Sequence, residues 1–175
     1  MSEPEFSRPT RTDTIGTSPR TIRLTAQPPE LAALARRFGI VGLQRLEAEV
    51  HLHRADPDIM MEGRLDADLV QSCVVSGAEL PAAVAETFTI RFRPEPADRA
   101  AEEEVELGEE ELDVMFYDGA MIDVGEAVAQ TLALNLDPYP RAPDAADALR
   151  EAGVLDEAAA GPFGALAALK DRLGK

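Results

Sequence analysis

The chain has 175 residues, of which 45% are hydrophobic and only 5% aromatic, and its formal net charge at pH 7 is −16. This length and apolar content suffice for one domain with a core built from Leu, Val, Ile and Ala. No apolar run reaches the roughly 18 residues of a membrane span. The N-terminus also lacks the apolar core of a signal peptide. We therefore expect a cytoplasmic protein that does not enter a membrane.

The acidity is confined to the second part of the chain. Residues 1–65 hold nine basic and nine acidic residues, whereas residues 66–175 hold eight basic and 24 acidic residues. The densest acidic run predicts a loop near residues 95–111, with Glu103, Glu104 and Glu110 among its carboxylates. Such a loop repels phosphate backbones, so we expect no DNA partner and no tight, direct binding of RNA through this half of the chain. It could attract a basic protein, or it could be a solvated loop without a partner.

The first part of the chain alternates a tail, strands and one helix. Residues 1–18 are polar and contain few apolar anchors, which predicts a disordered N-terminal tail before a single domain over 19–175. The patterns predict a strand over Thr21–Thr25, a helix over Glu30–Phe38 that stops at Gly39, and a long strand over Gly42–Arg54.

The middle of the chain is dominated by strands. From Glu62 the apolar positions alternate until the pattern slips at Val70, which suggests a bulge or a fully buried strand near Gln71–Val75. Pro81–Glu86 is interpreted as a loop or a single helical turn, and Thr87–Arg93 as a strand. The order of elements predicts an α+β fold, with an antiparallel sheet of about five to six strands, helices packed on one side and a helical C-terminus.

A turn and a helix follow the acidic run. The dipeptide Asp118-Gly119 suits a tight hairpin, so Leu112–Tyr117 should pair with a brief strand around Met121. Asp123 stands three residues before Glu126, the spacing of a capping box at a helix start.

The end of that helix and the C-terminal region are punctuated by proline. Pro138 and Pro140 prevent the helix from continuing. Further helices are predicted over Ala145–Glu151 and Phe163–Leu173. Before the first of these helices, Tyr139, Pro140 and Arg141 form an exposed tip of residue types that are favoured at interfaces. The alternative is plain helix termination, with the Tyr139 ring packed on the core.

The sequence predicts no catalytic residue, metal site or cofactor. His51 and His53 lie two apart on one face of a strand, a spacing that could chelate a metal if a further ligand converged on it. Cys73 is the single cysteine, which excludes an internal disulfide. It could act as a nucleophile only beside a histidine, and a buried structural thiol is the expected role.

Two long blocks and a tail carry a resemblance to a known family. GRLDADLVQSCVVSGAELPAAVAETFTIRFRPE at 63–95, MIDVGEAVAQTLALNLDPYPRAP at 121–143 and PFGALAALKDRL near the end resemble the YceD family of large ribosomal RNA subunit accumulation proteins. The resemblance implies a bacterial cytosolic protein needed for synthesis, processing or accumulation of 23S ribosomal RNA. Many relatives carry Cys-x-x-Cys where this chain has Cys73 followed by Val74, Val75 and Ser76. If those pairs serve zinc or redox chemistry, this chain lacks that function.

Two functions of different classes therefore stay open. The first is a non-enzymatic factor for large ribosomal subunit biogenesis that binds a ribosomal protein or a pre-50S particle. Its contact residues would be the tip and the acidic loop: Tyr139, Pro140, Arg141, Glu103, Glu104 and Glu110. The alternative is a metal-dependent hydrolase or nuclease that acts on precursor ribosomal RNA, which would need converging carboxylates or histidines and a divalent metal.

Overall fold

The computed structural model describes residues 4–95, 114–151 and 153, which fall into two units. The first unit holds the described residues 4–71, 81–95 and 114–137; the second holds 72–80, 138–151 and 153. The single domain that the sequence predicts over residues 19–175 stays a prediction.

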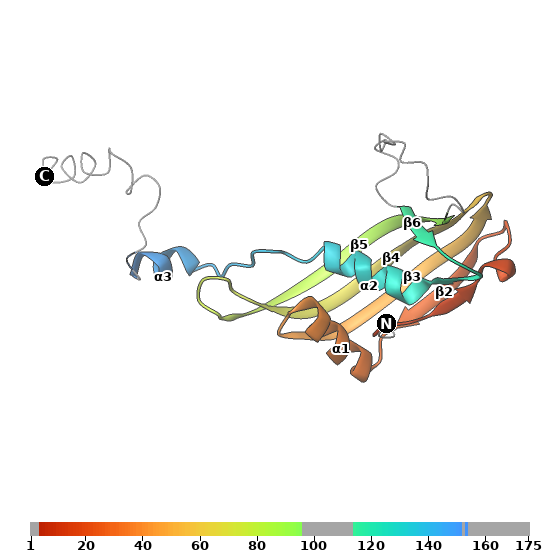
Figure 1. Ribbon diagram of the computed structural model, residues 1–175. Coiled ribbons are helices and arrows are strands. Elements are labelled where there is room, and N and C mark those ends of the chain that lie inside the picture. Colours follow the sequence, from red (N-terminus) through yellow and green to blue (C-terminus); the bar gives the residue numbers. More distant parts are fainter. Residues whose placement is uncertain (1–3, 96–113, 152, 154–175) are drawn as a thin grey trace, which may run out of the picture. The chain divides into compact units, whose positions relative to one another are not determined.

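A five-stranded sheet carries the first unit (Figure 1). Its strands lie in the order β2 (Arg20–Thr25), β3 (Gly42–Ala55), β4 (Asp58–Ser72), β5 (Glu79–Pro94) and β6 (Val114–Tyr117). A two-stranded sheet joins β1 (Pro9–Arg11) to β7 (Met121–Asp123) in antiparallel fashion. The other elements are the 3-10 turn η1 (Thr12–Thr14) and helices α1 (Pro28–Phe38), α2 (Val124–Leu134) and α3 (Ala145–Glu151).

Several locally encoded elements occur as predicted. Strands β2 and β3 and helix α1 match the expected segments within two residues. The α1 helix begins with a capping box in which the Glu30 carboxylate accepts the Gln27 backbone N–H at 2.7 Å. It ends at Gly39, whose φ of 66° lies in the left-handed region that favours glycine.

The α+β class is confirmed, but the sheet is mixed rather than purely antiparallel. Strand β6 runs parallel to β5, with Arg91 opposite Val114 and Pro94 opposite Tyr117. The predicted hairpin across Asp118-Gly119 is therefore wrong, because β6 pairs with β5 whereas β7 pairs with β1. Gly119 does take the positive φ of 81° that a turn needs. A turn signal fixes only the local backbone, and two other strand edges compete for these short segments.

The N-terminal segment departs from the predicted disordered tail. Within the described residues 4–18, Phe6 is fully buried and Ile15 is 5% exposed. The backbone N–H of Arg8 donates to the Asp123 carboxylate at 2.8 Å, and β1 follows one residue later. Two apolar anchors, together with β7 as a strand partner, are enough to hold this polar segment on the core.

The register slip expected at Val70 occurs in the neighbouring strand. The pairing of β3 with β4 shifts between Leu43 and Arg45, so the irregularity belongs to β3. In β4 the inward positions continue without a break through Leu69 to Gln71, which is 8% exposed.

Strand β5 is longer than predicted. The segment Pro81–Glu86, interpreted from the sequence as a loop or helical turn, is part of one strand from Glu79 to Pro94. Exposure alternates along the whole strand, and its even-numbered residues face the core. A proline near the start of an edge strand is tolerated when its missing N–H faces away from the ladder.

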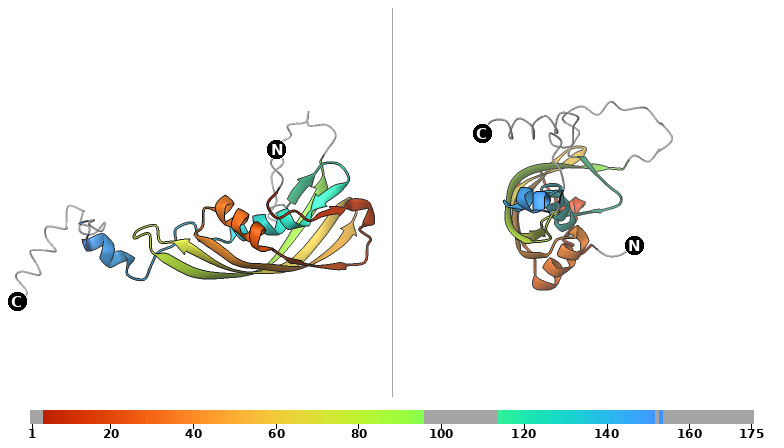
Figure 2. Two further views of the ribbon diagram at one scale, coloured as in Figure 1. Left: turned by 90° about the horizontal axis from the view of Figure 1, so that it is seen from below. Right: turned by 90° about the vertical axis from the view of Figure 1, so that its left-hand side faces the viewer.

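Helices α1 and α2 lie against the same face of the five-stranded sheet (Figure 2). On α2 most side chains are buried, including Val124, Ala127, Val128 and Leu132. On α1 only Leu34 and Ala35 are buried, so that helix has one apolar face. None of the helices in the described part of the chain has the length and apolar character that crossing a membrane would require.

Helix α3 matches the predicted segment Ala145–Glu151. The predicted helix over Phe163–Leu173 and the predicted acidic loop near residues 95–111 lie outside the described residues, apart from Glu95.

Candidate functional site

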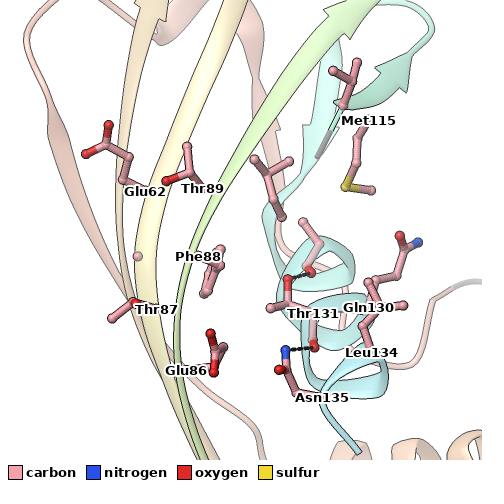
Figure 3. Close-up of a pocket in the computed structure, with 14 residues that line it drawn as sticks. Glu62, Glu86, Thr87, Phe88, Thr89, Met115, Gln130, Thr131, Leu134 and Asn135 are labelled. Carbon is pink, nitrogen blue, oxygen red and sulfur yellow. Dashed lines mark hydrogen bonds between the residues drawn. The ribbon is translucent and has the colours of Figure 1, made fainter. Parts of the chain in front are cut away.

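A cleft of about 800 Å³ opens between α2 and the sheet of the first unit (Figure 3). It is bordered by β4, by the middle of β5, by the start of β6 and by the C-terminal half of α2. The lining residues are Glu62, Gly63, Glu86, Thr87, Phe88, Thr89, Ile90, Val114, Met115, Ala127, Gln130, Thr131, Leu134 and Asn135.

The sheet wall of the cleft follows the alternation of β5. Glu86 and Phe88 project toward α2, whereas Thr87 and Thr89 project from the opposite side of the sheet, as Figure 3 shows. Phe88 packs over Gly63 of β4, where an added Cβ would lie 3.2 Å from the Phe88 ring and 2.8 Å from a backbone oxygen. The absence of a side chain at residue 63 therefore makes room for the aromatic ring at the cleft floor.

The helix wall mixes polar and apolar groups. The Thr131 hydroxyl donates to the Ala127 carbonyl at 2.9 Å, and the Asn135 amide donates to the Thr131 carbonyl at 2.9 Å (Figure 3). Leu134, the last residue of α2, is 85% exposed. An apolar side chain this exposed at the rim of a cleft offers area that a ligand could bury.

The start of α2 is fixed by the N-terminal segment. Asp123 caps the helix by accepting the Glu126 backbone N–H at 3.0 Å, as the sequence predicts, and it also accepts from the Arg8 backbone. At Gly125, an added Cβ would lie 2.1 Å from the Phe6 carbonyl oxygen. This backbone contact explains why only glycine fits at the second residue of the helix.

Glu126 does not reach back to complete the expected capping box; its carboxylate pairs instead with Arg37 of α1. The two hydrogen bonds measure 2.6 and 2.8 Å, and Gln130 donates to the same carboxylate at 2.9 Å. Hydrogen bonding to Arg37 lowers the pKa of Glu126, although partial burial opposes the shift. The pair joins α1 to α2 and holds Gln130 on the cleft wall.

The charge of the cleft is negative. Its described lining includes two carboxylates, Glu62 and Glu86, and neither Lys nor Arg. Glu86 faces the interior of the cleft among Phe88, Leu134 and Asn135. The arrangement suits a ligand that presents both apolar and positively charged groups.

The predicted tip residues lie in the second unit. Tyr139 is 72% exposed, and the Pro140 carbonyl accepts the Val74 backbone N–H at 2.9 Å. Arg141 is also exposed. The ring of Tyr139 is thus not packed in a core, but its role at an interface stays a prediction. Glu103, Glu104 and Glu110 lie outside the described residues, so the structure does not test a combined surface of tip and acidic loop.

Cys73 is buried in the second unit, at the first position of a tight turn. Its sulfur accepts the backbone N–H groups of Ala142 at 3.3 Å and of Ser76 at 3.5 Å. Hydrogen bonding from the Ser76 side chain, reinforced by these backbone donors, lowers the pKa of the thiol to about 6. Burial is as expected from the sequence, whereas the hydrogen bonds that lower the pKa come from residues whose contact with the sulfur the sequence does not indicate.

His51 and His53 lie on the outer face of β3. The His51 Nδ1 atom lies 3.0 Å from the Thr21 hydroxyl oxygen on β2. Across the ladder, His51 is opposite Glu62 and His53 is opposite Met60. Within residues 4–95, 114–151 and 153, no group of three or more His, Cys, Asp or Glu side chains is arranged to hold a metal ion.

Local sequence patterns did not predict that residues of β5 line a cleft. Ala82, Val84, Phe88 and Ile90 alternate with polar or small residues, and this period of two would have predicted a strand through Pro81–Glu86. The interruption of the apolar series at Glu86 hid the pattern. No sequence signal indicates that α2 leaves a space beside this strand.

The chain was also compared with known proteins. Residues 61–170 match the family described as "Large ribosomal RNA subunit accumulation protein YceD". Comparisons with curated proteins and with solved structures gave no significant match. The matched range contains most of β4, all of β5, β6 and α2, and hence every residue that lines the cleft. This chain belongs to the YceD family.

Proposed function

We propose that this protein is a cytosolic, non-enzymatic factor that supports accumulation of 23S ribosomal RNA in large-subunit biogenesis. It acts by binding a basic ribosomal protein, free or within a pre-50S particle. Contact with ribosomal RNA is indirect, because a chain of net charge −16 repels phosphate backbones.

The observation that carries the proposal is the cleft between α2 and β5. Its walls offer the exposed Leu134, the ring of Phe88 and the carboxylate of Glu86, without a basic residue in the described lining. These groups suit a protein segment that carries both apolar and positive side chains. The family name refers to accumulation of the large ribosomal RNA subunit, and a basic protein of that subunit is therefore the partner that we propose.

The negative charge of the protein also supports this proposal, because it raises the rate at which a basic partner associates. An acidic protein attracts basic partners over distances of about 10 Å at 0.1 M ionic strength, and this raises the association rate. The acidic residues of the second part of the chain would act in this way without each requiring a defined contact.

Affinity purification of the tagged protein from growing cells at moderate salt tests the proposal. We expect large-subunit ribosomal proteins or precursor particles to be enriched over a tagged, unrelated protein of equal size and similar negative charge. Equal recovery with the two baits, measured by quantitative mass spectrometry, would contradict the proposal.

A cleavage assay tests the non-enzymatic part separately. Purified protein is incubated with precursor 23S RNA and magnesium or manganese, and the RNA is analysed for new ends. We expect unchanged substrate. Cleavage that persists through purification and is lost on replacing His51 and His53, or the acidic run 95–111, would favour the nuclease alternative.

A further inference from the structure

One edge of β5 is only partly covered. Strand β6 pairs with Arg91–Pro94 at the C-terminal end of β5. Within the part of the chain that the structure describes, no strand pairs with residues 81–90 on that same side. Among the described residues, the backbone groups of about half of the 16-residue strand β5 therefore have no strand partner on this side.

The orientation of the backbone identifies which groups face this edge. Glu95, next to the end of β5, donates its N–H to the Tyr117 carbonyl at 2.9 Å. Backbone groups of a strand point to alternate sides with a period of two. Exposure alternates along β5 as far as Arg93, and the pairing with β6 keeps its register from Arg91 to Pro94. The N–H and C=O groups of Thr89 and Thr87 therefore face the uncovered edge. Pro81 is also odd-numbered, so its backbone nitrogen faces the same edge. The N–H that proline lacks is therefore not needed for a hydrogen bond to β4.

The cleft lies along this uncovered edge. It is lined by residues 86–90 of β5, and its upper end is formed by Val114 and Met115 of β6. The space beside residues 86–90 thus continues the line of β6 along β5, with α2 as the opposite wall (Figure 3). A chain entering this space in extended form would lie as a strand next to β5.

We propose that the cleft binds an extended segment of a partner protein by adding it as a strand to the edge of β5. Main-chain hydrogen bonds to Thr87 and Thr89 supply affinity, as in other cases of strand addition. Side chains on the inner face of the added strand meet Phe88, Leu134 and Glu86. We therefore expect every second residue of the bound segment, on the face toward the cleft, to be apolar or basic. This inference rests on the proposed function and specifies how the basic partner is held.

Charge separates this occupant from two others. Two copies of this chain would each bring a net charge of −16 and a Glu86 to the same edge, so they repel. The chain's own segment 96–113 has nine acidic residues and a single basic one, Arg99, and is likewise mismatched with Glu86. A segment that carries Lys or Arg is instead attracted electrostatically to Glu86, whereas these two acidic occupants are repelled by it.

The test uses the full chain and a fluorescent synthetic octapeptide of alternating valine and lysine, with binding followed by anisotropy. The same peptide, N-methylated at alternate residues on its pairing edge, lacks the backbone donors but keeps its side chains. On the protein, Thr89→Pro removes one edge N–H, whereas Thr89→Val retains it. Glu86→Gln removes the inward carboxylate, and Glu79→Gln removes an exposed carboxylate at the start of β5 that does not line the cleft. Circular dichroism verifies that each variant is folded.

We expect Thr89→Pro and N-methylation each to weaken binding by about tenfold, since a strand edge loses hydrogen bonds and a proline ring obstructs the approach. Glu86→Gln should weaken binding about threefold and reduce its salt dependence. Thr89→Val and Glu79→Gln should bind like the parent protein. Equal affinity for the parent and N-methylated peptides would overturn strand addition, even if Thr89→Pro failed to fold. A dimer of the parent protein that Thr89→Pro converts to monomer would assign the edge to a second copy instead.

The two proposals fail in different ways. If large-subunit material is recovered with the parent protein and equally with a folded Thr89→Pro variant, strand addition at β5 is wrong and the proposed function stands. If the parent protein recovers none, the proposed function is wrong, whatever the peptide result.

Discussion

The guanidinium of Arg37 on α1 donates two parallel hydrogen bonds, of 2.6 and 2.8 Å, to the carboxylate of Glu126 on α2. The Glu126 side chain is 17% exposed and that of Arg37 is 33% exposed, so solvent weakens this pair less than it weakens pairs on the outer face of the sheet. Glu5, near the N-terminus, accepts from the same guanidinium at 3.1 Å. Three segments far apart in sequence thus meet on one arginine.

Replacing Glu126 with Gln should lower the free energy of unfolding at pH 7 by about 1 kcal/mol, the upper range for a partly exposed ion pair. The pKa of Glu126 is lowered in the folded protein from its ordinary value of 4.5. Its contribution is therefore complete above pH 4.5 and is lost as pH falls through the lower folded value. Urea unfolding of both proteins should show the difference at pH 7 and its disappearance in acid.

A matched control for that change is Glu49→Gln. Glu49 pairs with Arg23 at 2.6 Å, but the two side chains are 45% and 83% exposed. We expect less loss of stability than for Glu126→Gln. Equal losses of stability would mean that the partial burial of the Arg37–Glu126 pair does not increase its contribution to the free energy of unfolding.

Substitution of Gly125 by Ala should destabilise the protein by about 1 to 3 kcal/mol, as overpacking does. The new Cβ would lie 2.1 Å from the Phe6 carbonyl oxygen, so the N-terminal segment or α2 must move. Gly16→Ala is the control, because nothing lies within 4 Å of the added atom. Thermal unfolding of the two variants should separate them clearly; similar midpoints would show that the segment carrying Phe6 yields at little cost.

The thiol of Cys73 should titrate near pH 6 in the folded protein rather than near its ordinary value of 9.0. Ultraviolet absorbance of the thiolate measures this midpoint. Ser76→Ala should raise the midpoint, since the Ser76 side chain is the largest cause of the shift. Ser72→Ala is the control, because the Ser72 hydroxyl donates to the Gly77 carbonyl and not to the sulfur.

The same shift makes a prediction about stability. The folded protein releases the thiol proton at lower pH than the unfolded chain does, so the contribution of Cys73 to stability grows as pH rises from about 6 to 9 and is lost as pH falls through 6. Cys73→Ala should remove this pH dependence from the free energy of unfolding. An unchanged slope in this window would contradict the lowered pKa.

Truncation of Phe6 to Ala should cost about 3 to 5 kcal/mol, the usual range for a fully buried phenylalanine. Phe116→Ala should cost far less, because that ring is 60% exposed. Chemical denaturation of both variants tests the difference. Equal stability of Phe6→Ala and the parent protein would place residues 4–8 outside the cooperative fold.

Elements that depend on neighbouring residues could be predicted from the sequence. The α1 helix has its capping signal at Glu30 and its stop at Gly39 within the segment, and β3 keeps a period of two from Leu46 to Leu52. The same holds for the cap at Asp123. In each case the groups that satisfy the backbone lie within a few positions along the chain, or the pattern repeats often enough to be recognised.

Features set by distant partners could not be predicted in this way. Neither β6 nor β7 carries a signal for its partner, because an edge of four residues or fewer fits several strands. Phe6 is a single aromatic residue in a polar segment, and its burial depends on space left by Gly125. The cleft has the same origin, because its walls come from β4, β5, β6 and α2, which are distant from one another in the sequence.

The pairing of β1 with β7 has a consequence for synthesis on the ribosome. Ser7 and Asp123 are 116 positions apart and lie 2.5 Å from one another through their side chains. Residues 6–11 therefore cannot pair with β7 until more than a hundred further residues have left the exit tunnel. Until then the Phe6 ring lacks its place in the core and is exposed to water. At about 5 to 20 residues per second this wait lasts several seconds or longer. Throughout that interval a newly made chain exposes an apolar side chain in its N-terminal segment. A chaperone that binds exposed apolar segments could bind the chain there.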